Sequence, residues 1–269
     1  MPSTPTKMSL GTVEVTTPKT QVNRMSTIIW GPSGSGKTTL AATAPRPMLY
    51  VNFDPDGTSS LMDQDDIYIA DFSMENPNKV VTFKHDNAGG IKQILDDHPD
   101  IKTVVFDSIT SFNEMSLRYA VSEVRGATME APTLQGYGRR NSYTMQGIMS
   151  VIKVTGALGK HCIFVAHEDS PQKDELSGAM MVSILVGGKM QSEIPIKLSE
   201  VWHMEDTGKA RKITIRSSRL RKPMKSRMFV QSGDSDFTWD FNPESWEGEG
   251  IEAWYDAWNK NGGKKIPLP

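Results

Sequence analysis

The amino-acid sequence predicts an α/β fold with a doubly wound, mostly parallel sheet and antiparallel strands at its edge. Two observations predict it: short apolar runs alternate with stretches long enough for crossover helices, and a glycine-rich segment directly follows the first run. Of the 269 residues, 37% are hydrophobic and 23% are charged, which is typical of a globular protein. This length suits one α/β core with additional segments at both ends.

Four apolar runs have the length and composition of buried strands, and they cover residues 27–30, 48–51, 103–106 and 162–166. The stretches 37–44, 88–97, 111–124 and 138–158 are compatible with helices, each long enough to connect parallel strands. Residues 201–204 and 212–216 alternate polar and apolar side chains, which favours one-sided strands. Because Gly208 lies between these two, we expect an antiparallel hairpin there.

The C-terminal residues predict a helix that packs on the core. Ile251, Trp254, Tyr255 and Trp258 follow one another at helical spacing and form one apolar face. Stacking of nucleic-acid bases on these rings is the alternative, but the surrounding carboxylates would repel phosphate. The expected organisation is a flexible arm over residues 1–23, a core over 24–232, and an acidic, tryptophan-rich segment with this docking helix over 233–269.

Composition excludes several classes of protein. Cys162 is the only cysteine and lies in an apolar run, so neither a disulfide nor a cysteine-rich zinc site is expected. The first residues lack an apolar signal core, and no run of about 18 apolar residues occurs, so we expect no membrane partner and a cytoplasmic location. The net charge is −2, but residues 209–227 are basic and 234–256 acidic. The basic stretch is either a binding strip or is neutralised within the fold.

The strongest motif is G-x-x-x-x-G-K-T, located between a predicted strand and a predicted helix. Such a loop wraps phosphates with backbone N–H groups; Lys37 would bridge the β- and γ-phosphates of ATP, and Thr38 would ligate Mg²⁺. The predicted nucleotide-binding residues are Gly31, Pro32, Ser33, Gly34, Ser35, Gly36, Lys37, Thr38 and Thr39.

Carboxylates follow two of the predicted strands. Asp107 ends the strand at 103–106, where it would hold Mg²⁺ opposite Thr38 in the manner of a Walker B residue. Ser108 follows it instead of a glutamate, so the residue that orients water must come from another strand end. Asp54 and Asp56 follow the strand at 48–51, which we expect beside the strand that precedes the motif. A Pro-Gly turn with two solvated acids is the alternative.

His167 and Glu168 follow the strand at 162–166, where a polar side chain can sense the γ-phosphate. A single histidine without ligand-spaced partners is weak evidence for zinc, and a plain hydrogen bond at the strand end is the other alternative. The polar stretches 125–140 and 169–193 predict mobile loops at the same edge of the sheet. Arg139, Arg140 and Lys189 in these stretches are candidate contacts to the phosphates of DNA.

These features together resemble the RecA-type P-loop ATPases, specifically phage-encoded, single-domain RecA-like ATPases of single-strand annealing and recombination. The resemblance covers residues 25–222 and rests on segments 29–45, 51–57, 104–108, 137–140 and 159–168. It implies that Asp56, just before Gly57, matches the position of the family's acid, that the two polar stretches contact DNA, and that a neighbouring subunit's γ-phosphate is reached by a basic residue. The candidates for that role are Arg219, Arg221 and Lys222.

The resulting functional hypothesis is a Mg²⁺-dependent ATPase that binds single-stranded DNA in phage recombination or annealing. It would self-associate into a ring or filament and work beside a single-strand binding protein in the host cytoplasm. An ATP-driven loader or adaptor in phage replication or packaging is the alternative, and a small-molecule kinase is less favoured because no lid signature is found. A GTP switch is disfavoured because D-x-x-G at residues 54–57 has no N-K-x-D partner.

Overall fold

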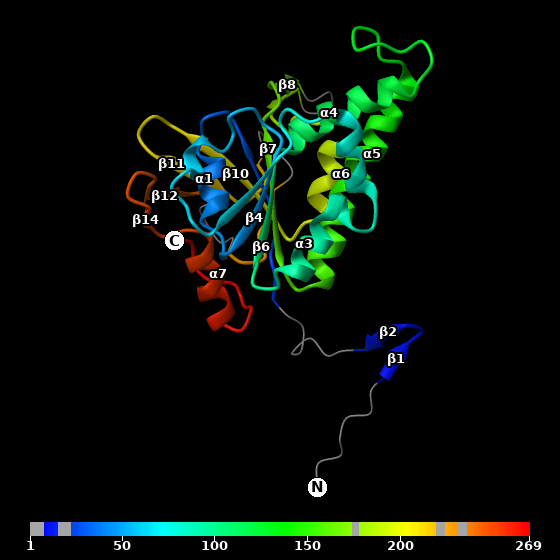
Figure 1. The fold of residues 1–269 in the computed structure, drawn as a ribbon. Coiled ribbons are helices and arrows are strands. Elements are labelled where there is room, and N and C mark those ends of the chain that lie inside the picture. The colour runs from blue at the N-terminus through cyan, green and yellow to red at the C-terminus, as the bar shows by residue number, and fades with distance from the viewer. Residues whose placement is uncertain (1–7, 16–22, 174–177, 219–223, 231–235) are drawn as a thin grey trace.

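The computed structural model describes residues 8–15, 23–173, 178–218, 224–230 and 236–269. Its centre is an eight-stranded sheet in the order β12-β11-β10-β3-β7-β6-β4-β5 (Figure 1). The strands from β10 to β5 in this order are parallel, whereas β11 and β12 are antiparallel. The mostly parallel α/β sheet with antiparallel edge strands is therefore confirmed. The strands are β3 (Ser26–Gly31), β4 (Met48–Asn52), β5 (Ile67–Asp71), β6 (Thr103–Asp107), β7 (His161–His167), β10 (Glu200–Asp206), β11 (Arg211–Thr214) and β12 (Asp236–Trp239).

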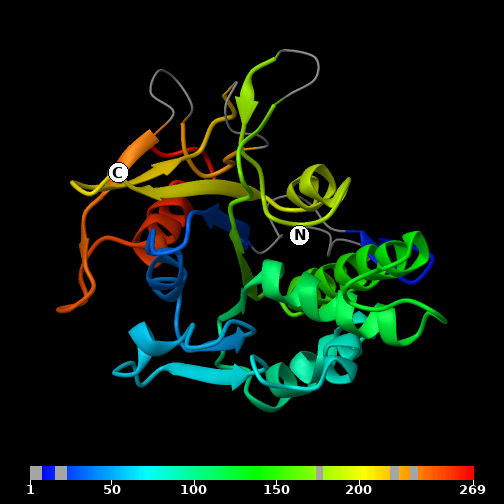
Figure 2. The same cartoon turned by 90° about the horizontal axis from the view of Figure 1, so that it is seen from above.

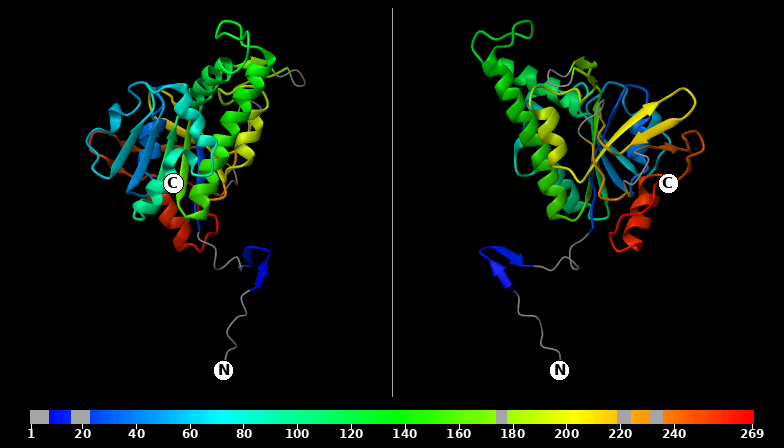
Figure 3. Two further views of the ribbon diagram at one scale, coloured as in Figure 1. Left: turned by 45° about the vertical axis from the view of Figure 1, so that its right-hand side comes forward. Right: turned by 180° about the vertical axis from the view of Figure 1, so that it is seen from behind.

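Helices cover both faces of this sheet. Helices α3, α4, α5 and α6 lie on one face, and α1 and α7 on the other (Figures 1 and 3). The helices are α1 (Lys37–Ala42), α2 (Pro77–Val80), α3 (Ile91–Asp97), α4 (Ile109–Ser122), α5 (Leu134–Ala157), α6 (Met190–Ile196) and α7 (Ile251–Lys260), with 3-10 turns at Ser59–Leu61, Val81–Lys84 and Ala88–Gly90. Three small hairpins are β1 (Met8–Leu10) with β2 (Val13–Val15), β8 (Gln172–Lys173) with β9 (Met180–Met181), and β13 (Phe241–Asn242) with β14 (Glu247–Gly248).

Two hydrophobic cores follow from the period of two along each strand. Ile28 and Trp30 of β3 point into the core under α3 to α6, whereas Ile29 between them points toward α1 and α7. Val104 and Phe106 of β6 likewise join the first core and Val105 the second. Because both faces are buried, the strands read as continuous apolar runs.

The order of the strands corrects one prediction. β4 does not lie beside β3, as we expected, but is separated from it by β7 and β6 (Figure 2). Consecutive strands are neighbours in most sheets, which is why we expected β4 beside β3, but the crossover through α1 passes two strand positions that β6 and β7 occupy. Strand β5 was also missed, because its half-exposed edge position gives it a less apolar pattern than the inner strands.

Helix boundaries correct a second prediction. The stretch 125–140 is not a loop throughout, because α5 already begins at Leu134 and therefore contains Arg139 and Arg140. The Thr133 side chain accepts a hydrogen bond from the Gly136 N–H and caps the helix. Similarly, β8, β9 and the start of α6 occupy part of the stretch 169–193.

The edge hairpin and the C-terminal helix are confirmed. β10 and β11 pair antiparallel across Gly208, with His203 opposite Thr214. In α7, Trp254 is 3% exposed and its ring lies 5.8 Å from that of Phe229 and 5.5 Å from that of Phe237, so the aromatic face packs on the core. Within the described ranges, no helix has the length and apolar character needed to cross a membrane.

His161 connects the sheet to the C-terminal helix. Its Nδ1 accepts a hydrogen bond of 3.1 Å from the Met25 N–H, and its ring lies 4.3 Å from that of Tyr255. Burial, and then the nearby charges of Arg24, Lys102 and Lys160, lowers the pKa of His161 from 6.5 to about 4. The native protein therefore holds this imidazole neutral over a range in which the unfolded chain protonates it.

We predict that this histidine makes the native state less stable in acid. Between pH 6.5 and about 4 the unfolded state binds the additional proton, so the free energy of unfolding falls as the pH is lowered through that window. The loss is on the order of 3 kcal/mol at its full extent. Urea unfolding at several pH values should give a shallower dependence for His161→Gln than for the wild type. His98→Gln, at an exposed histidine, is the matched control, and equal slopes for all three proteins would contradict the prediction.

Candidate nucleotide-binding site

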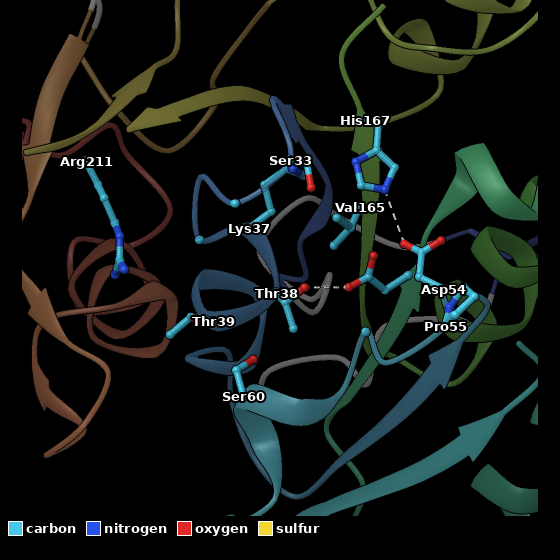
Figure 4. A pocket seen from close by; sticks show the side chains of 14 residues that line it. Ser33, Lys37, Thr38, Thr39, Asp54, Pro55, Ser60, Val165, His167 and Arg211 are labelled. Atoms are coloured by element: carbon cyan, nitrogen blue, oxygen red, sulfur yellow. Dashed lines mark hydrogen bonds and ion pairs between the residues drawn. The ribbon is translucent and has the colours of Figure 1, made fainter. Parts of the chain in front are cut away.

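The glycine-rich loop between β3 and α1 borders a cavity of about 540 Å³ (Figure 4). Gly34 and Gly36 have φ angles of 77° and 93°, which glycine adopts at little cost and other residues do not. The N–H groups of the first turn of α1 have no partner within the helix, and such groups are suited to phosphate oxygens. The loop therefore has the conformation that the sequence motif predicts.

The predicted loop residues divide into two groups. Ser33, Gly34 and Gly36–Thr39 line the cavity. Gly31, Pro32 and Ser35 shape the loop from behind, since the buried Ser35 hydroxyl donates to the Pro32 carbonyl at 2.9 Å. This division reflects the turn itself, because a tight loop presents only part of its residues to one side.

Lys37 is buried and its ammonium donates a hydrogen bond of 2.5 Å to the Pro32 carbonyl. Burial lowers the pKa of Lys37, whereas the carboxylates of Asp107, Asp54 and Glu168 act in the opposite direction. An ammonium has three N–H donors, so donors remain for phosphate oxygens beside this one carbonyl.

Asp107 ends β6 as predicted, and its Oδ2 accepts a hydrogen bond of 2.9 Å from the Thr38 hydroxyl. The Tyr50 hydroxyl of β4 donates to the same oxygen. Burial raises the pKa of Asp107 to about 6, although the hydrogen bond from Tyr50 lowers it. Tyr50 was not predicted as a site residue, because a tyrosine inside an apolar run has the pattern of a core residue.

The structure separates the two candidate acids after β4. Asp54 lines the cavity and its carboxylate has three hydrogen-bonding partners, whereas Asp56 is exposed, has a φ of 56°, and does not line this cavity. Asp54 Oδ1 accepts from Ser108 at 3.1 Å and from the Ser111 hydroxyl, and its Oδ2 lies 3.3 Å from His167 Nε2. Burial alone would raise the pKa of Asp54, but the hydrogen bonds from His167, Ser111 and Ser108 outweigh it and lower the pKa.

His167 and Glu168 point to different partners. His167 lines the cavity beside Asp54. The Glu168 carboxylate instead lies 2.5 Å from Nε2 of the buried His203 of β10, and Glu168 is not among the described residues that line the cavity. Successive residues of a strand point to opposite faces, so the two side chains diverge at this strand end.

The remaining predicted residues lie away from the cavity or outside the described ranges. Arg139 forms an ion pair of 3.0 Å with Glu123. Arg140 is half-buried, with its guanidinium 5.0 Å from the Tyr137 ring centre and close to Gly187. Lys189 is exposed at the start of α6. Arg219, Arg221 and Lys222 lie outside the described residues.

Five residues of the cavity wall were not predicted as site residues: Pro55, Gly57, Ser60, Val165 and Arg211. Arg211 lies on β11, about 175 residues after the motif, and only the strand order brings it to the loop. The one signal in the sequence was its place in the basic stretch 209–227. Another cation of that stretch, Lys212, lies 3.4 Å from Asp236, so part of the strip is neutralised within the fold.

Thr38 and Asp107 have the donor chemistry that Mg²⁺ requires. They bring a hydroxyl oxygen and a carboxylate oxygen within 2.9 Å, and Mg²⁺ at nucleotide sites takes one or two protein oxygens together with phosphate and water. Across the described part of the chain, no cluster of three or more His, Cys, Asp or Glu side chains could hold a metal by itself. These residues therefore provide no ligand cluster in which His167 could bind zinc.

Compared with known protein families, residues 23–227 match a family described as an AAA domain. The chain belongs to this AAA domain family. The match spans the whole central sheet except β12 and includes every residue of the cavity wall named above. Together with the loop between β3 and α1 and the mostly parallel sheet, it identifies an α/β fold of the P-loop class.

Solved structures similar to this AAA domain protein include a KaiC-like protein from the hyperthermophilic archaeon Pyrococcus horikoshii OT3. It is 16% identical, with 81% of this chain and 86% of that chain covered and a TM-score of 0.43. The RadB recombinase is 13% identical, with 81% and 88% covered and a TM-score of 0.44. No curated protein matches the chain.

We predict that Gly31 is required by the close approach of β10 to the loop. A Cβ atom at Gly31 would overlap the Met204 carbonyl oxygen, whereas a Cβ at Gly34 would meet nothing within 4 Å. Gly34→Ala should lower the free energy of unfolding by about 1 kcal/mol, the cost of the left-handed conformation. Gly31→Ala should cost about 3 kcal/mol or more, because backbone must move. Urea unfolding compares them, and equal losses would show that the Met204 contact is unimportant.

Proposed function

We propose that this protein binds ATP together with Mg²⁺ and hydrolyses it. The observation that carries the proposal is the convergence of Lys37, the Thr38–Asp107 pair and the Asp54–His167 pair on one cavity. A phosphate-binding cation, a metal-binding pair and a carboxylate that can orient water are the parts that hydrolysis of a nucleoside triphosphate requires. ATP is favoured over GTP because the sequence lacks N-K-x-D.

Each part has a separate task. Lys37 and the N–H groups of the loop would hold the β- and γ-phosphates, and Thr38 with Asp107 would hold Mg²⁺. When bound, Mg²⁺ would neutralise negative charge on the phosphate oxygens. Tyr50, by donating to Asp107, fixes the orientation of that carboxylate toward Thr38.

Asp54 is the residue that we assign to the attacking water. Its Oδ1 accepts from Ser108 and Ser111. Among the described residues its Oδ2 has only the longer contact with His167, so it retains capacity for a water proton. The water oxygen would bond to the γ-phosphorus while the bond to the β–γ bridging oxygen breaks and leaves its electron pair on ADP. Because its pKa is lowered, the Asp54 carboxylate is a weak base. It therefore orients the water without taking up its proton, which leaves with the phosphate or passes to solvent.

Single-stranded DNA is the proposed partner, in recombination or annealing and with self-association of the protein. Two exposed lysines support it: Lys173 on β8 and Lys189 at the start of α6 both lie in the segment that follows His167. A segment that begins at the cavity and carries cations can connect the nucleotide to a phosphate backbone. Phage origin and a cytoplasmic location remain part of this proposal through the resemblance of the sequence.

Hydrolysis with and without DNA tests the proposal. The wild type should hydrolyse Mg²⁺–ATP faster when single-stranded DNA is present, and Lys37→Ala should lose at least about 100-fold in rate, because its ammonium holds the transferred phosphoryl group. Binding of a labelled oligonucleotide should weaken as salt rises. Lys37-dependent hydrolysis that is indifferent to DNA, with no oligonucleotide bound, would favour a loader or adaptor, and phosphate transfer to a small molecule would favour a kinase.

The neighbouring acids provide a matched pair of variants. Asp54→Asn should retain ATP binding but lose about 100-fold or more in the hydrolysis rate, because the amide cannot replace the carboxylate beside the water. Asp56→Asn, two residues away and exposed, should hydrolyse ATP at close to the wild-type rate. Single-turnover hydrolysis with binding measured separately distinguishes the two steps. The reverse order of effects would return the role to Asp56, as the resemblance implies.

A further inference from the structure

Arg211 of β11 lies against the phosphate-binding loop from the same chain. Its Nε and Cδ are 3.2 and 3.3 Å from the position that a Cβ on Gly36 would occupy, and its side chain lines the cavity. Among the described residues it forms neither an ion pair nor a side-chain hydrogen bond, and its guanidinium carbon lies 5.7 Å from the centre of the Trp239 ring. A half-buried cation whose five N–H donors are unused by these residues is suited to a ligand.

Its place along the cavity defines which part of a nucleotide it can reach. In Figure 4, Arg211 lies beyond Lys37 and Thr39 on one side, while Asp54 and His167 lie on the opposite side. The Thr38–Asp107 pair and Asp54 mark the end where Mg²⁺ and the attacked γ-phosphate would lie. A nucleotide that extends from there across Lys37 must direct its nucleoside toward Arg211.

Aromatic side chains of the C-terminal segment pack beside Arg211 and hold it at the cavity wall. Trp239 is opposite Arg211 in the register of β11 and β12 and is 4% exposed. Its ring stacks on that of Phe241 at 5.0 Å and an angle of 9°, and Phe241 contacts Trp246 at 5.5 Å. The Trp239 indole N–H also donates to the Glu249 carbonyl at 2.9 Å. The acidic, tryptophan-rich C-terminal segment thus supports a residue of the cavity wall.

We propose that Arg211 binds the nucleoside end of the bound ATP, through its base and α-phosphate, and that Trp239 is a positioning residue for it. This inference rests on the proposed function and deepens it. It assigns the C-terminal segment a role in nucleotide affinity. It also gives Arg211 a role different from that of a cation that acts on the γ-phosphate. A guanidinium is suited to both contacts, because its planar face stacks on rings and its edge pairs with phosphate.

Calorimetric titration with AMP-PNP, ADP and inorganic pyrophosphate, each with Mg²⁺, tests the inference. Arg211→Ala should raise the Kd of AMP-PNP and of ADP by the same factor, about tenfold for the loss of one charge-assisted contact. The Kd of pyrophosphate should not change, because it occupies only the part of the cavity beside Lys37. Trp239→Ala should give a similar but smaller loss, and Trp239→Phe should retain most of the affinity because it keeps a ring.

Lys212→Ala is the matched control, since this neighbouring cation pairs with Asp236 instead of facing the cavity. Thermal unfolding of each variant excludes a general loss of structure. Unchanged nucleotide affinity in Arg211→Ala would overturn the inference, as would a loss for AMP-PNP without a loss for ADP. A wild-type protein that binds no nucleotide would overturn the proposed function as well, whereas wild-type binding that depends on Lys37 but not on Arg211 overturns only the inference.

Discussion

The register of the parallel strands is the constraint on which the rest of the structure depends. Gly31 pairs with His167, Asn52 with Asp107 and Asp107 with Val165, so the ends of β3, β7, β6 and β4 meet at one edge. The Phe53 N–H donates to the Asp107 carbonyl at 2.6 Å and the Glu168 N–H to the Gly31 carbonyl at 3.0 Å, which extends this pairing beyond the strands. A slip of one residue would turn Asp107 to the opposite face and remove it from Thr38.

Packing beneath the edge fixes the carboxylate that we assign to water. Phe53, directly before Asp54, is 2% exposed and contacts the rings of Phe106 at 4.5 Å and Phe112 at 5.3 Å. Phe112 belongs to α4, which also supplies Ser111, and Gly147 of α5 leaves room for the Phe112 ring. The same cluster therefore holds the backbone before Asp54 and the helix whose hydroxyl binds it. A substitution in this cluster would therefore displace residues at the cavity, because protein interiors are close-packed and transmit strain.

Local patterns predicted the parts of this site that a short segment defines. The loop from Gly31 to Thr38, the carboxylate of Asp107 at a strand end and the aromatic face of α7 each depend on neighbours in the chain, so spacing was sufficient. Apart from the pairing of Asp107 with Thr38, which the motif itself implies, the contacts between distant segments could not be predicted from local patterns. The position of β4, with β7 and β6 between it and β3, depends on a crossover whose destination no local pattern encodes. The same holds for the choice of Asp54 over Asp56 for the cavity wall and for the approach of Arg211. Tyr50 was missed because its ring packs in the hydrophobic core and only its hydroxyl takes part in the site, through the bond to Asp107.

The charges along the cavity give it a direction that agrees with the assignment of Arg211. Asp54 and Asp107 lie near one end, and burial raises the pKa of Asp107 because the carboxylate is removed from water close to another acid. A triphosphate would be repelled there unless a divalent cation intervened, so that end can accept the γ-phosphate only together with Mg²⁺. Arg211 at the other end carries a positive charge without a carboxylate partner among the described residues. A nucleotide is therefore favoured electrostatically in one orientation, with its metal-bound phosphates at the acids and its nucleoside at the guanidinium.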